Sequence, residues 1–171
     1  MSGGMEVRLL NKNDVNAFRS LRLLSLQTDP SAFASLYDIE INYPVSKFEQ
    51  RLECSDTKFT MGGFEDENLV CVATFYREAV KKMHHKGNLV AMYCHPDYRG
   101  TGIAEKVVDK LIIEASKLTG LKYIDLSVLS NNQRAVEFYN KVGFDKYATE
   151  PNAIFDGKDY YDEDMMRYEI E

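Results

Sequence analysis

A long amphipathic helix that begins directly after a glycine turn is the feature that most constrains how this chain folds. Its apolar residues recur every three or four positions and form a single stripe: Ile103, Val107, Val108, Leu111, Ile112, Ala115 and Leu118. A stripe of this kind is stable only when another layer of structure buries it. Gly120, followed by Leu121, is typical of a glycine helix stop. Strand-like segments at 88–95 and 123–128 lie on either side of the helix in sequence, so we expect the helix to cover a sheet.

The rest of the chain continues this alternation of strands and helices. Side chains between Asn11 and Asp14 are suited to cap the first helix, and Ser46 is suited to cap a short one that runs to Leu52. A polar turn at 65–68 predicts a hairpin. In chain order, the patterns predict strand 7–10, helix 15–26, helix 46–52, strands 57–64, 69–78 and 88–95, helix 102–118, strand 123–128, helix 132–142, and strands 144–149 and 160–168. The fold class is therefore α/β (mixed α+β), with a mixed sheet of about seven strands flanked by helices in a single domain, 1–171.

Composition excludes several classes of protein. The 171 residues are 44% apolar and 28% charged, as expected for one globular domain. The three cysteines form no CxxC pair and the three histidines have no metal-ligand spacing, so we expect neither a disulfide framework nor a metal site. No segment approaches the roughly 20 apolar residues that cross a bilayer, and the first residues do not resemble a secretory leader. We expect a cytoplasmic protein with no membrane partner.

The charge of the chain is negative and unevenly distributed. The net charge is −6, which argues against nucleic acid as the main partner because such binding needs clustered cations. The segment 150–171 alone accounts for this excess of acids. It predicts either a solvated, repulsive surface or an acidic rim that attracts a positively charged amine.

The segment that leads into the long helix is built to hold an anion. A strand ends at Pro96, and a cation, Arg99, and two glycines, Gly100 and Gly102, follow before the helix begins. Backbone N–H groups in such a turn lack partners, and the helix dipole favours negative charge there. The segment lacks the lysine of a phosphate-binding P-loop and the third glycine of a dinucleotide fold. It therefore predicts a phosphate cradle of another type.

Two motifs together resemble the GNAT superfamily of N-acetyltransferases. The coenzyme A loop of that family has the pattern Q/R-x-x-G-x-G/A, which Arg99–Ala104 satisfies, with alanine at the last position. The family's later helix has the pattern N-x-x-A-x-x-x-Y-x-K-x-G-F, which residues 132–144 match. The motifs stand in the right order with a strand between them, and the resemblance extends over nearly the whole chain.

The resemblance implies acetyl-CoA as co-substrate, bound mainly by residues 88–144. Strand residues 92–94, splayed from the neighbouring strand, would pair with the pantetheine arm, and the glycine turn would hold the pyrophosphate. Ala135 would be small to let the coenzyme pass, and Tyr139 would donate a proton to the departing thiolate. The implied cofactor-binding residues are Met92, Tyr93, Cys94, Arg99, Gly100, Thr101, Gly102, Ile103, Ala104, Asn132, Ala135 and Tyr139.

Several chemical roles stay open at this point. Asn132 is suited to cap its helix, and a capping box of Ser130 and Gln133 is the alternative. Glu78, Tyr93, Asp125 or a water chain are the candidates for the general base. A strand N–H, at Tyr93 or Cys94, would hold the oxyanion. Direct attack by the amine is favoured over a Cys94 nucleophile, because no histidine and acid partner for Cys94 is visible in the sequence.

The acceptor amine is the least constrained part of the prediction. Within the family it ranges over polyamines and other small amines, aminoglycoside-like drugs, amino acids and protein amines. By resemblance, the acceptor site is walled by about 11–54 and 150–160. The side chains there that suit a small cationic acceptor are Phe33, Tyr37, Tyr43, Asp38, Glu40 and Asp156. The alternative is that these are ordinary core and surface residues. A protein acetyltransferase and a non-catalytic coenzyme A-binding sensor are the alternatives, and a homodimer is compatible with the sequence.

Overall fold

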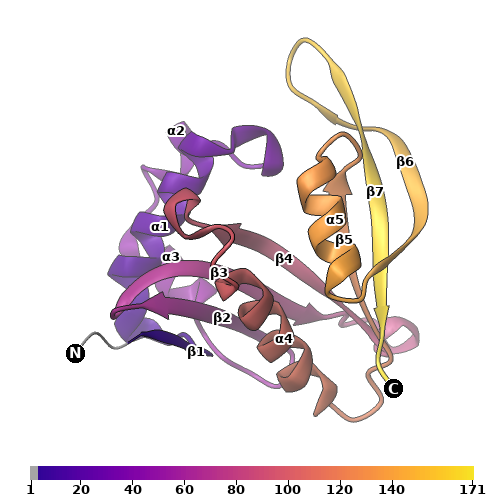
Figure 1. Ribbon diagram of the computed structural model, residues 1–171, viewed down its shortest axis with the longest axis horizontal. Coiled ribbons are helices and arrows are strands. Elements are labelled where there is room, and N and C mark those ends of the chain that lie inside the picture. The colour runs from indigo at the N-terminus through magenta and orange to yellow at the C-terminus, as the bar shows by residue number, and fades with distance from the viewer. Residues whose placement is uncertain (1–3) are drawn as a thin grey trace.

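The computed structural model describes residues 4–171 and contains one seven-stranded sheet with helices on both faces (Figure 1). In chain order the elements are β1 (Met5–Leu9), α1 (Val15–Thr28), α2 (Tyr37–Glu40), α3 (Val45–Arg51), β2 (Lys58–Glu65), β3 (Asn68–Arg77), β4 (Lys86–Cys94), α4 (Ile103–Ser116), β5 (Tyr123–Leu129), α5 (Gln133–Lys141), β6 (Asp145–Phe155) and β7 (Tyr160–Glu169). Among the described residues, no helix combines the length and apolar character that crossing a membrane requires.

The sheet is mixed, as the sequence predicts. Its strand order is β1-β2-β3-β4-β5-β7-β6, and every neighbouring pair is antiparallel except β4 and β5, which are parallel. The parallel pair is connected through α4, the crossover that such a pair needs. The β2–β3 hairpin is also confirmed, and both of its turn residues, Asp66 and Glu67, have the positive φ of a tight hairpin turn.

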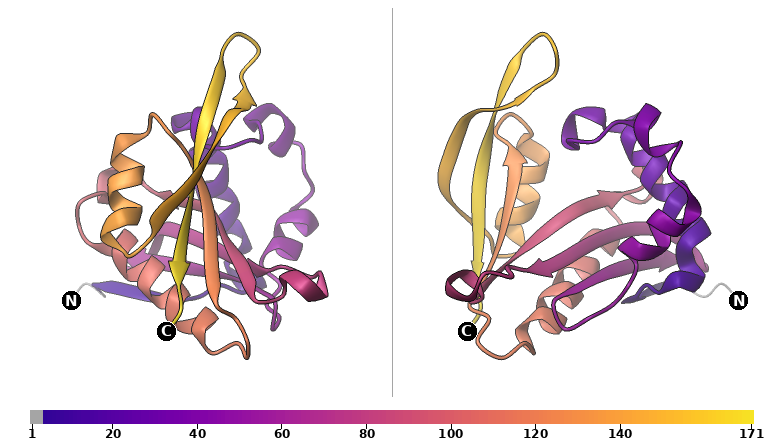
Figure 2. Two further views of the ribbon diagram at one scale, coloured as in Figure 1. Left: turned by 90° about the vertical axis from the view of Figure 1, so that its right-hand side faces the viewer. Right: turned by 180° about the vertical axis from the view of Figure 1, so that it is seen from behind.

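Alternating side chains of the strands belong to two apolar clusters, one on each face of the sheet. Cys71 and Ala73 of β3 belong to the cluster under α4, whereas Val72 between them belongs to the cluster under α1 and α3. Gly63 lets α4 approach closely, because a Cβ there would lie 2.7 Å from Val107. Figure 2 shows α4 on one face of the sheet and α1 on the other.

The sheet splits between its two parallel strands. β4 pairs with β5 only through the three residues from Lys86 to Asn88, and beyond them β4 turns away. A bulge accompanies the turn: the β3–β4 register shifts between Val72 and Thr74, and Ala91 has φ 53°. The edge of β4 that faces β5 is left without a strand partner from Leu89 onward. The splayed strand implied by the resemblance is present.

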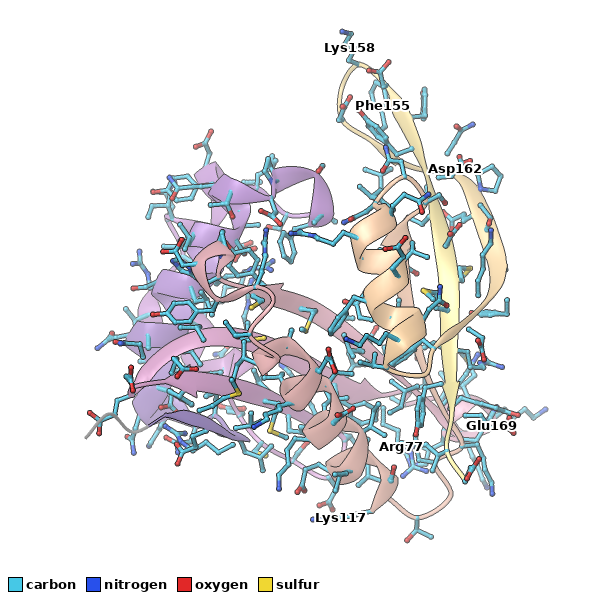
Figure 3. All side chains as sticks on the ribbon, in the orientation of Figure 1. Arg77, Lys117, Phe155, Lys158, Asp162 and Glu169 are labelled. Atoms are coloured by element: carbon cyan, nitrogen blue, oxygen red, sulfur yellow. The ribbon has the colours of Figure 1, made fainter. Side chains whose placement is uncertain are left out.

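Two local predictions were wrong. The loop between the predicted strands 144–149 and 160–168 is shorter than expected, because β6 continues to Phe155. The register of β6 with β7 shifts in a bulge between Glu150 and Ile154, where Asn152 has φ 52°. The Asn152 N–H donates to the Asp162 carboxylate over 2.9 Å. The resulting β6–β7 hairpin projects beyond the rest of the molecule, with Phe155 and Lys158 near its tip (Figure 3).

The second wrong prediction concerns the start of α3. Pro44 rather than Ser46 is its N-cap, and Pro44 makes no side-chain capping bond. The extended backbone of Pro44 (ψ 154°) already ends the preceding segment, so the helix begins at Val45, two residues before the expected first turn.

Candidate active site

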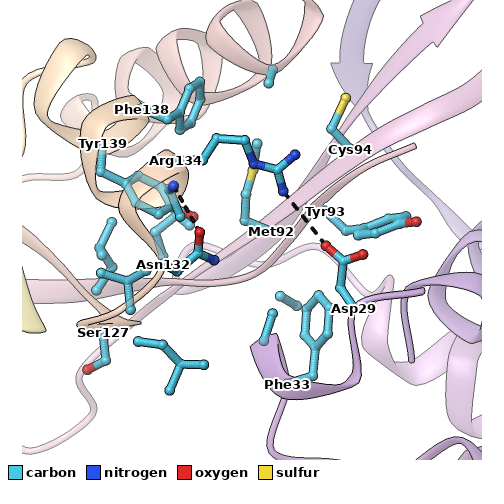
Figure 4. Close-up of a pocket in the computed structure, with 18 of the residues that line it drawn as sticks. Asp29, Phe33, Met92, Tyr93, Cys94, Ser127, Asn132, Arg134, Phe138 and Tyr139 are labelled. Atoms are coloured by element: carbon cyan, nitrogen blue, oxygen red, sulfur yellow. Dashed lines mark hydrogen bonds and ion pairs between the residues drawn. The ribbon is translucent and has the colours of Figure 1, made fainter. Parts of the chain in front are cut away.

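A cavity of about 320 Å³ lies in the split between β4 and β5. Figure 4 shows its labelled side chains converging from the end of α1, from β4 and β5, and from α5. The predicted residues that line it are Met92, Tyr93, Cys94, Arg99, Gly100, Ala104, Asn132, Ala135 and Tyr139. The two sequence motifs, more than 30 positions apart, therefore contribute to one cavity.

Three predicted residues do not line this cavity with their side chains. Thr101 donates its hydroxyl hydrogen to the Tyr98 carbonyl over 2.6 Å and so braces the turn. Ile103 is fully buried in the core under α4. Gly102 is the N-cap of α4, with φ 90°.

The glycine turn fits a phosphate group. Gly100 and Gly102 both have φ in the left-handed region, at 82° and 90°, and no heavy atom lies within 4 Å of where a Cβ would stand. The N-cap Gly102 has no side chain to cap α4, and the Ile103 N–H makes only a long hydrogen bond, of 3.4 Å, to the Thr101 hydroxyl. Open space above exposed N–H groups at a helix N-terminus is the arrangement that binds phosphates.

Arg99 is held by the opposite wall of the cavity. Its Nε donates to the Cys94 carbonyl over 3.1 Å, and its Nη2 donates to the Asp29 carboxylate over 3.0 Å. Arg134 of α5 approaches the same carboxylate to 4.0 Å (Figure 4). Neither Asp29 nor Arg134 was among the site residues predicted from the sequence. Asp29 thus contacts both Arg99 and Arg134, at the place where the resemblance implies that the pyrophosphate of coenzyme A binds.

Asn132 begins α5 and fixes its position beside the cavity. Its side-chain oxygen accepts a hydrogen bond from the Ala135 N–H over 3.2 Å, so the Asn132 cap is confirmed. The alternative capping box is wrong, because the Ser130 hydroxyl donates to Asp164 over 2.6 Å instead. The cap aligns the first turn of α5 so that Ala135 and Tyr139, four residues apart, share one face.

Tyr139 is a buried phenol in the wall of the cavity. Only 8% of the residue is exposed, and its ring lies edge-on to Phe138 and Phe144, with ring centres 5.3 and 5.9 Å away. Burial, with a further contribution from Cys71, raises the pKa of Tyr139 well above its usual value. The hydroxyl therefore stays protonated at neutral and moderately alkaline pH, as a proton donor must.

The structure separates two candidates for the general base from the cavity. Asp125 is paired with Arg167 through contacts of 2.7 and 3.0 Å, and Glu78 accepts a hydrogen bond from Asn88 over 3.1 Å. Neither residue lines the cavity, and each side chain is already held by its partner. Their partners come from neighbouring strands, and the sequence alone does not reveal which residues the strand register brings together.

Tyr93 and Glu163 are the remaining ionisable side chains to consider. Tyr93 lines the cavity, shares a 2.7 Å hydrogen bond with Thr28, and has its pKa raised mainly by burial. Glu163 of β7 also lines the cavity, and burial together with the opposing Glu150 raises its pKa. In the sequence, Glu163 was visible only as one member of the acidic segment. A carboxylate with a raised pKa is the better proton acceptor.

Cys94 faces the cavity beside a second thiol. Cys71 lies directly opposite Cys94 in the β3–β4 register, and both are free. A hydrogen bond from the Cys71 thiol, aided by Arg99 and Arg134, lowers the pKa of Cys94 despite its burial. Within residues 4–171, no histidine ring or carboxylate hydrogen-bonds the Cys94 sulfur, and no group of three His, Cys, Asp or Glu side chains is arranged to hold a metal ion.

Of the side chains expected to attract a cationic acceptor, only Phe33 lines the cavity. Glu40 is completely buried and accepts hydrogen bonds from Arg22 (3.1 and 3.0 Å) and Arg51 (2.8 Å). Burial alone would raise its pKa, but these hydrogen bonds outweigh that effect and lower the pKa of Glu40 to about 2. Asp156 accepts hydrogen bonds from the N–H groups of Lys158 and Asp159 in the β6–β7 turn. Glu40 and Asp156 are therefore structural, in agreement with the alternative that these side chains are core and surface residues.

Comparisons with known proteins point to one family. The model of the acetyltransferase (GNAT) family matches residues 23–144. An acetyltransferase of the GNAT family from Streptococcus pneumoniae has a similar structure, with a TM-score of 0.85 and 22% identity over 98% of this chain and 99% of that one. The yncA protein of Salmonella typhimurium, solved with its cofactor acetyl-CoA, gives a TM-score of 0.81 and 18% identity over 99% of this chain and 95% of that one.

A curated relative matches over a shorter stretch. An uncharacterized N-acetyltransferase, MJ1207, from Methanocaldococcus jannaschii is 36% identical over 55 residues, which are 32% of this chain. The matched stretch spans about a quarter (24%) of that relative's length.

Proposed function

Because the chain belongs to the acetyltransferase (GNAT) family, we propose that it transfers the acetyl group of acetyl-CoA to a primary amine of a small molecule by direct attack. The observation that carries this proposal is the cavity in the β4–β5 split, where the glycine turn at one side and the buried Tyr139 at the other share one space. A phosphate cradle and a proton donor in the same cavity are the two parts that this reaction needs.

The residues around the split are suited to hold acetyl-CoA. The unpaired edge of β4 from Leu89 to Cys94 offers backbone groups to an extended amide-containing arm, as an added strand would use them. Gly100 and Gly102 leave room for a pyrophosphate above the N-terminus of α4. Ala135 is small and lies in the cavity wall one turn before Tyr139. Bound acetyl-CoA supplies the acetyl group as a thioester, which an amine can attack without an acyl-enzyme.

Each step of the transfer then has a residue to support it. An N–H of β4, at Tyr93 or Cys94, stabilises the negative charge that forms on the carbonyl oxygen. Glu163, directly or through water, accepts the proton that the amine loses on forming its bond to carbon. Tyr139 donates its hydroxyl proton to the sulfur when the carbon–sulfur bond breaks. The products are an amide and a thiol, and return of the proton from Glu163 to the Tyr139 oxygen through water restores both groups.

Two alternatives fit the cavity less well. A coenzyme A-binding sensor has no use for a buried phenol beside the cavity. A small acceptor is favoured over a protein amine because the cavity, at about 320 Å³, is of the size that encloses small molecules.

The test is release of free thiol from acetyl-CoA over a panel of small primary amines, with a reaction lacking amine as the control. We expect amine-dependent thiol release, and a melting temperature that rises with acetyl-CoA because a ligand bound only by the folded state stabilises it. A rise in melting temperature without thiol release from any amine would favour the sensor. No rise at millimolar acetyl-CoA would contradict the proposal altogether.

A further inference from the structure

A second cavity, of about 240 Å³, adjoins the first on the other side of the bulge in β4. Its floor is the sheet face that carries Val72, Thr74 and Tyr76 of β3, and α1 and α3 cover it. Val90, Ala91 and Tyr93 line both cavities. A molecule whose reacting end lies in the first cavity could therefore extend past Ala91 into the second.

The charged side chains that line this second cavity all have one sign, and the nearby Glu78 carboxylate, which helps to raise the pKa of Tyr76, does not line it. Arg22 of α1, Arg51 of α3 and Lys58 of β2 line it, and no aspartate or glutamate does. Glu40 lies behind the two arginines, fully buried, and its pKa of about 2 keeps it ionised at neutral pH. One carboxylate thus offsets one of three cations, and the cluster keeps a surplus of positive charge.

Lys58 is the one of these three cations that Glu40 does not bind. Its side-chain ammonium forms no ion pair or hydrogen bond with any described residue, whereas both arginines are bound by Glu40. Lys58 lies directly opposite Tyr76 in the β2–β3 register, on the same face of the sheet. The Tyr76 hydroxyl likewise makes no hydrogen bond to the described residues. An ammonium and a phenol side by side, both without protein partners, are donors for an oxyanion.

We propose that the second cavity binds a carboxylate of the acceptor, so that the substrate class is a small primary amine that also carries a carboxylate, as amino acids do. The inference rests on the proposed acetyl transfer and names its acceptor. The amine lies in the first cavity near Ala91 and Glu163, and the carboxylate lies among Lys58, Tyr76 and the Nη1 group of Arg22, which Glu40 does not bind. A wholly cationic acceptor, such as a diamine, would meet the surplus positive charge of this cavity and be disfavoured.

The test compares each amino acid with its carboxamide, which lacks only the negative charge of the carboxylate. Individual L-amino acids and their carboxamides share the amine and the side chain, so the ratio of their kcat/KM values isolates the carboxylate. We expect the wild-type protein to prefer the acids. The substitution Lys58→Met, which keeps the apolar stem, should reduce that ratio by roughly tenfold or more, the effect of losing one hydrogen bond to a charged group.

Two further variants control the experiment. Lys58→Arg should restore most of the preference, and Lys12→Met, which removes an exposed lysine that lines neither cavity, should leave it unchanged. If carboxamides or diamines react as well as the acids, or if Lys58→Met leaves the ratio unaltered, the carboxylate subsite is wrong while amine acetylation stands. If no amine of any kind releases thiol, the proposed function itself fails and the subsite with it.

Discussion

Arg99 and Asp29, 70 positions apart, form an ion pair of 3.0 Å that joins the end of α1 to the glycine turn before α4. Arg134 approaches the same carboxylate from α5, on the opposite side of the cavity. Asp29 therefore neutralises part of the positive charge that would otherwise face an anionic coenzyme. The pair also fixes the acceptor-side helix to the cofactor-side turn.

Asp29→Asn should tighten the binding of acetyl-CoA, because both guanidinium groups lose their competing anion. We expect a dissociation constant about three- to tenfold lower, measured by titration calorimetry, together with a small loss of stability of up to ~1 kcal/mol. The exposed Asp38 provides the control, since Asp38→Asn removes the same charge outside the cavity. Weaker binding in Asp29→Asn would mean that Asp29 orients the arginines rather than competes for them.

Gly102→Ala and Gly157→Ala form a matched pair for the phosphate cradle. Both glycines have a positive φ (90° and 97°), and at neither position does a heavy atom lie within 4 Å of where a Cβ would stand. Each substitution should therefore destabilise the fold by a similar ~1 kcal/mol. Only Gly102→Ala should weaken acetyl-CoA binding, because Gly157 lies in the β6–β7 turn. Equal affinity in the two variants would place the pyrophosphate elsewhere.

Glu40 should make the protein sensitive to acid. Its folded-state pKa of about 2 is below its ordinary value of 4.5, so its contribution to stability is complete above about pH 4.5 and is lost as the pH falls toward 2. Glu40→Gln leaves two guanidinium groups without their counter-ion and should cost about 3 to 5 kcal/mol at pH 7. Urea unfolding at pH 7 and pH 3 measures both effects. Glu53→Gln, on an exposed residue, should change neither value.

Cys94→Ala distinguishes direct attack from an acyl-enzyme. Its sulfur faces the cavity and its pKa is lowered, yet no histidine or carboxylate in residues 4–171 hydrogen-bonds it. We expect Cys94→Ala to keep turnover within about threefold of the wild type, since direct attack needs no covalent intermediate. An inactive variant, together with an acetylated Cys94 found by mass spectrometry in the wild type, would establish the acyl-enzyme instead.

The sequence predicted the elements whose signals are local. The stripe of α4 is set within a few residues, but α4 ends at Ser116, before the glycine stop predicted at Gly120, which has its positive φ (80°) in the turn that follows. The cap of α5 by Asn132 is equally local. The extension of β6 past Pro151 was missed because the bulge at Asn152 depends on a bond to Asp162 across the hairpin.

The parts of the site that could not be predicted depend on contacts between distant elements. Asp125 forms an ion pair with Arg167, which lies opposite it in the β5–β7 register. That register is not visible in the sequence. Asp29 and Glu163 reach the cavity from α1 and β7, outside both motifs. The three cations of the second cavity come from three separate elements, so no single segment of the sequence signals them.

Tyr139→Phe tests most directly the claim that this cavity catalyses acetyl transfer with Tyr139 as the proton donor. The measurement is the single-turnover rate with acetyl-CoA and an accepted amine from pH 7 to pH 10. Tyr168→Phe is the control, because Tyr168 also packs on Phe144, with ring centres 5.6 Å apart, but does not line the cavity.

We expect Tyr139→Phe to lower the rate by roughly 100-fold with little change in the affinity for acetyl-CoA. The ordinary pKa of a tyrosine is ~10, and that of Tyr139 is raised. The wild-type rate should therefore show no decline from ionisation of Tyr139 up to pH ~10. Equal rates for Tyr139→Phe, Tyr168→Phe and the wild type at every pH would contradict the account and leave Tyr139 as a packing residue of α5.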